Sequence, residues 1–214
     1  MSKKQMAKKQ SQPKQRFSRK VRRSMILDSA ADMIATDGTS GLSMEAIGQK
    51  AEVSKALMYR YFDSLIDLLR ELLDRELKAL RRQQFEVAEK ATTFEELVRN
   101  VTRVYLLNIE ERGMVIERLQ AYPNISNAPD PTYFRRGQAV EYFANLVAKS
   151  FDLPIEDAAA YTDISFGLPA SAGEYLLRSG MSRQRVEDIT VAMIIGSLTG
   201  MKYDISIRSQ KLKR

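Results

Sequence analysis

Apolar residues recur at helical spacing along almost the whole chain from residue 19 onward, and this periodicity constrains the fold more than any other feature. Ile26, Ala30 and Ile34 repeat every fourth residue, and Leu69 and Leu73 continue the same spacing further along. No run of strict alternation between apolar and polar residues and no hairpin signature interrupts the pattern. A period near 3.6 residues is typical of helices that bury one face. The sequence therefore predicts an all-α protein.

Capping residues divide this pattern into separate helices. A first helix is expected over residues 19–37, because Gly38 follows it as a C-terminal stop. Ser43 is a suitable N-cap for a short second helix, and Ser54 for a third helix that reaches about Phe62. Later helices are expected over residues 65–90, between Thr93 and Gly113 with Glu96 completing a capping box, over 114–122 and 131–151, over 154–179 with a kink at Pro169, and over 182–206.

The stretch from Ser43 to Phe62, SMEAIGQKAEVSKALMYRYF, predicts two short helices joined by a tight turn, which is a helix-turn-helix. In the second of these helices Met58 and Phe62 lie four residues apart and should face inward together with Val53. The remaining residues form an outward face that is cationic and aromatic and contains no acid: Lys55, Ala56, Leu57, Tyr59 and Arg60. Such a face suits a nucleic-acid groove lined with phosphates.

Basic residues concentrate at the N-terminus. Of the 34 lysines and arginines, ten lie in residues 1–23, where no acid occurs, and the other 24 are set against 27 acids. Residues 1–17 form a polar, basic arm that we expect to be disordered when free. A basic arm on a mildly acidic body indicates a polyanionic partner, either nucleic acid or an anionic membrane. Taken alone, the arm is explained equally well as a solubilising tail.

Two absences narrow the possible chemistry. The chain contains no His and no Cys, which excludes a Ser-His-Asp triad, a thiol nucleophile and zinc sites built from thiolate and imidazole ligands. No stretch approaches the roughly 18 apolar residues of a membrane-spanning helix, and no apolar segment follows the basic N-terminus as in a secretory signal. We therefore expect a cytoplasmic protein that is not an enzyme, has no catalytic residue and needs no cofactor or metal.

Two rival interpretations remain open on the sequence. An enzyme could use tyrosines and carboxylates, although no paired-acid motif and no phosphate-binding glycine loop supports it. A membrane-surface protein could use the basic arm, although Phe17 is the only Trp, Phe or Leu residue there that could insert into lipid.

The helix-turn-helix segment resembles the DNA-binding head of the TetR family of repressors over about residues 20–70. The matching positions are Ile47, Ala51, Val53, Ser54, Tyr59, Tyr61, Phe62 and Ser64. The sequence departs from the family pattern at five positions: Ser43 stands for Thr, Gly48 for Ala, Glu52 for the turn Gly, Ala56 for a frequent Gly, and Leu65 for a Lys that often contacts phosphate. Gly48 should weaken its short helix slightly, because glycine is a poor helix former.

The resemblance implies how the head would bind DNA. The third helix would lie in the major groove with Lys55, Ala56 and Leu57 nearest the base edges, and a lysine there would favour guanine. Ser43, Tyr59 and Tyr61 would contact phosphates, although the two tyrosines could instead only pack between helices. Arg19, Lys20, Arg22 and Arg23 could add phosphate contacts. The expected DNA-binding residues are thus Arg22, Arg23, Ser43, Lys55, Ala56, Leu57, Tyr59, Arg60 and Tyr61.

The rest of the chain is larger than a DNA-binding head requires. We expect a three-helix head over residues 18–79 after the arm of residues 1–17, and a larger helical domain over 80–214 that dimerises and holds a ligand, as the resemblance implies. Ala192, Gly196 and Gly200 recur every fourth residue, and small residues also cluster at 167–173. Small residues let helices approach closely, so this pattern favours a homodimer that reads a palindromic duplex. Packing within one subunit is the alternative.

A small-molecule effector is the last expectation, and the resemblance implies that it releases the repressor from DNA. Apolar and aromatic residues with a few acids could line a pocket for a partly apolar ligand. The candidate residues are Tyr105, Ile109, Glu110, Met114, Tyr122, Phe143 and Phe166. The alternative is that each of these residues belongs to the ordinary core.

Overall fold

The computed structural model describes residues 18–125 and 131–211, and the described residues form helices and turns without any strand. The predicted arm of residues 1–17 lies outside them. The helices are α1 (Arg19–Asp37), α2 (Met44–Lys50), α3 (Lys55–Met58), α4 (Leu65–Ala88), α5 (Phe94–Arg112), α6 (Val115–Gln120), α7 (Pro131–Phe151), α8 (Ile155–Ser165), α9 (Gly167–Ser179) and α10 (Arg183–Lys211). The all-α prediction is confirmed. None of the described helices is both long and apolar enough to cross a membrane.

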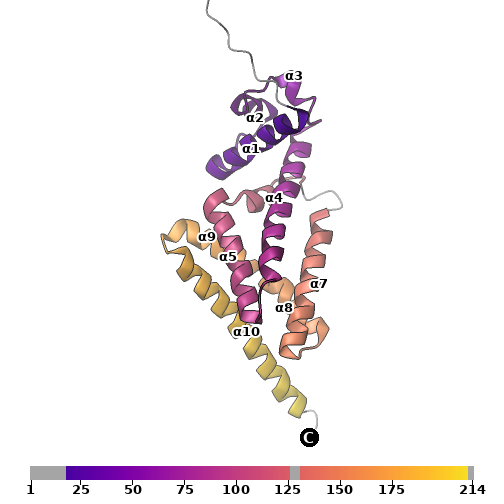
Figure 1. Ribbon diagram of the computed structural model, residues 1–214, viewed down its shortest axis with the longest axis vertical. Coiled ribbons are helices and arrows are strands. Elements are labelled where there is room, and N and C mark those ends of the chain that lie inside the picture. Colours follow the sequence, from indigo (N-terminus) through magenta and orange to yellow (C-terminus); the bar gives the residue numbers. More distant parts are fainter. Residues whose placement is uncertain (1–17, 126–130, 212–214) are drawn as a thin grey trace, which may run out of the picture.

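The molecule is elongated, with α1, α2 and α3 gathered at one end (Figure 1). The helix α4 runs from this head into a body built from α5 and the later helices, and it passes residue 79 without interruption. Each of the first five helices begins at a hydroxyl side chain that accepts a hydrogen bond from the backbone N–H three residues later: Ser18, Ser43, Ser54, Ser64 and Thr93. These caps explain why the chain starts its helices where the sequence predicted.

The largest apolar core joins the head to the body. Ile34 from α1, Ile47 from α2, Met58 from α3 and Leu69 from α4 are all fully buried there. Val115, Ile116 and Leu119 of α6 belong to the same core. The segment α6 is therefore packed directly against the head, although it follows α5 in sequence. Two smaller cores lie in the body, one around Leu198 and one around Leu106.

Two predicted details of the helices were wrong, and a third is confirmed in part. The third helix ends at Met58 rather than near Phe62, and the chain continues as tight turns. The helix expected over 154–179 is two helices separated at Phe166, because Pro169 has no N–H for the carbonyl of Ser165 four residues earlier. The expected capping box is confirmed in one half, because the Thr93 hydroxyl accepts from the backbone N–H of Glu96 at 3.1 Å, and the Glu96 carboxylate accepts from the backbone N–H of Thr92 at 2.8 Å.

Candidate nucleic-acid interface

The turn between α2 and α3 is held by backbone hydrogen bonds and one unusual conformation. The N–H of Val53 donates to the carbonyl oxygen of Gly48 at 2.8 Å, and Ser54 then caps α3. Glu52 adopts a positive φ of 54°. Few residues other than glycine adopt this left-handed conformation without strain, which costs about 1 kcal/mol. The turn glycine that Glu52 replaces would relieve this strain.

Gly48 has a packing role that the sequence comparison did not indicate. A Cβ atom at this position would lie 3.0 Å from Met58 Cγ and 3.0 Å from the carbonyl oxygen of Val53. The absence of a side chain therefore lets α2 approach both α3 and the turn closely. This close packing offsets the cost of placing glycine, a poor helix former, within α2.

The short helix α3 separates its side chains as the spacing predicted, with one exception. Met58 and Phe62 are buried with Val53, while Lys55, Ala56, Tyr59 and Arg60 are exposed. Tyr59 is 47% exposed although it is aromatic. The exception is Leu57, which is partly buried against the head core. Lys55 on α3 and Tyr59 and Arg60 in the turn after it are therefore exposed together, while Met58 and Phe62 hold this segment on the core.

Two predicted phosphate-contacting residues have additional structural contacts. The Ser43 hydroxyl accepts from the N–H of Ala46 at 3.0 Å as the N-cap of α2. A hydroxyl that accepts a hydrogen bond at a cap can still donate its own proton to a phosphate oxygen. Tyr61 is partly buried against the head core, so its ring also packs between helices. Arg22 is partly buried on α1.

Arg23 is bound inside the head. Its guanidinium donates to both carboxylate oxygens of Glu71, with Nε 2.6 Å from Oε1, and to the carbonyl oxygen of Tyr61. The same guanidinium lies 4.3 Å from the centroid of the Phe62 ring. Arg23 thus ties α1 to α4 and to the end of the helix-turn-helix. The sequence did not reveal its partner Glu71, because the two residues lie 48 positions apart.

We expect Arg23→Lys to lower the free energy of unfolding by about 1–2 kcal/mol although it keeps the charge, because lysine cannot bind Glu71 and the Tyr61 carbonyl with one planar group. Urea denaturation monitored by circular dichroism measures the loss. Arg19→Lys is the matched control, since Arg19 is exposed on the same helix α1, and it should be close to neutral. Equal stability of the two variants would show that the Arg23 contacts do not hold the head.

The seven predicted pocket residues are spread over the body. Tyr105 donates a hydrogen bond to Glu117, while Glu110 pairs with Arg183 at 2.8 Å. Burial and the charge of Glu117 raise the pKa of Tyr105 well above its usual value. Of the others, Ile109 is buried, Met114 precedes α6, Tyr122 packs on the head core, and Phe143 meets Phe166 edge to face with ring centroids 6.0 Å apart.

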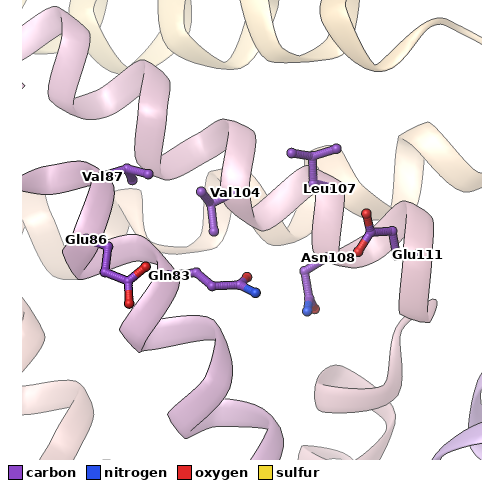
Figure 2. A pocket seen from close by; sticks show the side chains of 7 residues that line it. All are labelled: Gln83, Glu86, Val87, Val104, Leu107, Asn108 and Glu111. Carbon is purple, nitrogen blue, oxygen red and sulfur yellow. The ribbon is translucent and has the colours of Figure 1, made fainter. Parts of the chain in front are cut away.

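An open hollow of about 300 Å³ lies between α4 and α5. Figure 2 shows its lining, with side chains from α4 on one side and from α5 on the other. None of the seven predicted pocket residues lines it. The lining residues are Gln83, Glu86, Val87, Val104, Leu107, Asn108 and Glu111.

Comparison with known proteins agrees with this architecture. Residues 26–72 match the model of the bacterial regulatory proteins of the tetR family. No curated protein sequence matches the chain. A TetR-like transcriptional regulator from Rhodococcus sp. RHA1 is 22% identical, covers 86% of this chain and 100% of its own, and superposes with a TM-score of 0.70.

Two further solved structures share the fold over most of their length. A putative transcriptional regulator from Pseudomonas aeruginosa PAO1 is 14% identical, with a TM-score of 0.72 over 88% of this chain and 96% of its own. The ketosteroid transcriptional regulator KstR2 of Mycobacterium tuberculosis is 19% identical, with a TM-score of 0.62 over 82% and 94%. Identities this low establish a common fold only, whereas the family match covers the helix-turn-helix itself. The N-terminal head therefore matches the tetR family of bacterial regulatory proteins over residues 26–72, and the chain as a whole has the fold of TetR-like transcriptional regulators.

Proposed function

We propose that this protein is a homodimeric repressor that binds a palindromic double-stranded DNA operator through α3 and leaves it when a small molecule binds the body. The exposed cationic and aromatic face of α3 carries the proposal. Lys55 is exposed on α3, and Tyr59 and Arg60 are exposed in the turn directly after it, while Met58 and Phe62 anchor the other side of this segment in the core. A rigidly supported helix with such a face fits the major groove, where lysine and arginine bind phosphates and base edges.

Within this proposal the DNA-contacting residues have different roles. Lys55, Ala56 and Leu57 lie nearest the bases, and Ser43, Tyr59, Arg60 and Tyr61 bind phosphates together with Arg22. Arg23 acts by holding the head together, since its guanidinium is bound to Glu71 and to Tyr61. We divide the chain at about residue 79 into the DNA-binding head and the body, and we expect it to act in the cytoplasm without catalytic activity.

The dimer is supported by a second apolar face on α10. Val186, Ile194 and Leu198 are buried within the subunit. A separate exposed stripe follows spacings of four and three residues along the same helix: Ile189, Met193, Gly196, Gly200 and Tyr203. Such a repeat is typical of helices that pair side by side. Two copies of this stripe, one from each subunit, would cover each other in a two-fold dimer.

Small residues on α9 and α10 support the same surface, with one exception. A Cβ added at Gly167, Gly196 or Gly200 would meet no atom within 4 Å, so these positions face away from their own subunit. Gly173 does not belong to this group. A Cβ there would lie 3.0 Å from Ile109 Cγ1, so Gly173 serves the packing of α9 on α5 within the subunit.

The release mechanism is supported by the contacts of α6 with the head. Arg118 of α6 donates to the carbonyl oxygens of Ile34 and Ala35 at the end of α1, the latter at 2.9 Å. One residue earlier, Glu117 binds Tyr105, and no hydrogen bond from the described residues reaches its buried Oε2 atom. A ligand that binds near Tyr105 in only one position of α6 would bias the position of the head. It would thereby lower the affinity for DNA.

Selection of bound duplexes from a random pool tests the DNA proposal, and we expect a palindrome. Lys55→Ala should lower affinity for the selected duplex about 10-fold and relax the preference at one position in each half-site. Tyr59→Ala should lower affinity about 5-fold on every duplex, because it removes only a phosphate contact. Fluorescence anisotropy measures both effects.

The matched control for this charge removal is Lys149→Ala, since Lys149 is exposed on α7 in the body. It should bind like the parent. If Lys55→Ala and Tyr59→Ala also bind like the parent, α3 does not contact DNA.

A further inference from the structure

Glu45 is an acidic residue on a surface that would face a polyanion. It lies in the first turn of α2, and its carboxylate forms a short ion pair with the ammonium of Lys55, the first residue of α3. Both side chains are more than half exposed, at 55% for Glu45 and 65% for Lys55. The hydrogen bond between them lowers the pKa of Glu45 and raises that of Lys55, so both groups are charged at neutral pH.

A structural role explains this pair poorly. An exposed ion pair contributes little to stability. The α2–α3 arrangement is already held by the buried contacts of Ile47, Val53 and Met58. At the same time, a carboxylate beside α3 repels the phosphates that the neighbouring cations attract. The pair therefore weakens the non-specific attraction of this surface for phosphates, and a benefit must lie elsewhere.

We propose that Glu45 is a specificity-determining residue that restricts Lys55 to a base contact and withholds it from the phosphate backbone. The inference rests on the proposed docking of α3 in the major groove. A lysine ammonium has three donors. Lys55 can keep one bond to Glu45 and donate the others to O6 and N7 of a guanine. Reaching a phosphate would instead bring the carboxylate close to the backbone or break the pair.

This arrangement predicts unequal effects on two kinds of DNA. Non-specific binding depends almost entirely on phosphate neutralisation, so it is weakened while Lys55 is paired with Glu45. Binding to the selected operator keeps its guanine contact and loses little. Specificity is the difference between the binding free energies for the two duplexes, and it increases when the phosphate contact of Lys55 is weakened while its guanine contact is kept.

The test compares Glu45→Gln with the parent on the selected palindrome and on a random duplex of equal length, between 50 and 200 mM salt. We expect the variant to bind the random duplex about 10-fold more tightly, with a salt dependence steeper by about one phosphate contact. Its affinity for the palindrome should change less than 2-fold. Glu52→Gln is the matched control, because Glu52 is an exposed acid of the same head. It should change both affinities by one common factor.

A second comparison tests whether the effect of Glu45 depends on Lys55. In a Lys55→Ala background, Glu45→Gln should behave like Glu52→Gln, because no ammonium remains to be withheld. If Glu45→Gln shifts both duplexes equally, or keeps its selective effect without Lys55, the role of Glu45 is refuted while the proposed function stands. If the parent selects no duplex at all, the proposed function and this inference fail together.

Discussion

Replacing Glu187 with alanine is expected to lower the free energy of unfolding by about 3 kcal/mol, which is the typical cost of removing one partner from a buried ion pair. Glu187 is 0% exposed. Its carboxylate accepts from Arg103 at 2.9 and 3.1 Å and lies 3.6 Å from both Arg99 and Arg183. Without it, Arg103 would lose the carboxylate that it binds through two hydrogen bonds, while Arg99 would keep Asp188 and Glu95 and Arg183 would keep Glu110.

The substitution should also weaken the packing of α10 against α5, because Arg99 and Arg103 lie on α5 and Glu187 lies on α10. Asp188→Ala is the matched control. Asp188 is the next residue and also binds Arg99, at 2.6 Å, but its side chain is 43% exposed. Water screens it, so its removal should have a much smaller effect.

Urea denaturation at one protein concentration compares the three proteins, since the stability of the proposed dimer would depend on concentration. Equal unfolding midpoints for Glu187→Ala and Asp188→Ala would show that the buried Glu187 carboxylate stabilises the fold no more than the exposed Asp188 carboxylate does. A change in slope rather than midpoint would indicate that the variant unfolds in a different way.

Met193→Arg is expected to convert the proposed dimer to a monomer and to lower affinity for the proposed operator by about 100-fold or more. Met193 is 53% exposed in the middle of the α10 stripe, so the subunit itself should tolerate the change. In the proposed two-fold dimer, the new cations of the two subunits would be buried against an apolar surface. The loss in affinity follows because linking two heads adds a factor of 10²–10⁴ over one head alone.

Phe85→Arg is the matched control, because Phe85 on α4 has the same exposed fraction of 53%. It introduces the same charge outside the α10 stripe and should leave a dimer. Light scattering measures the mass of both variants, and anisotropy measures operator binding. A Met193→Arg protein that remains a dimer with parental affinity would remove the α10 stripe from the interface.

Local signals in the sequence determined the helices of the head. The spacing of Ile26, Ala30 and Ile34 and the stop at Gly38 predicted α1 with its exact bounds. The hydroxyl residues Ser43 and Ser54 predicted where α2 and α3 begin. These features act within one helical turn, so a single stretch of sequence contains all the information that they need.

Contacts between distant residues were decided only by the tertiary structure. Nothing near Arg23 indicates that Glu71 would bind it, and nothing near Glu187 indicates that Arg99 and Arg103 would bind it, because these partners lie on different helices. The same holds for α10, where apolar residues lie on two sides of one helix. The spacing of apolar residues indicates that a face of the helix is buried against another element. Only the packed fold shows which of the two apolar faces is buried within its own subunit.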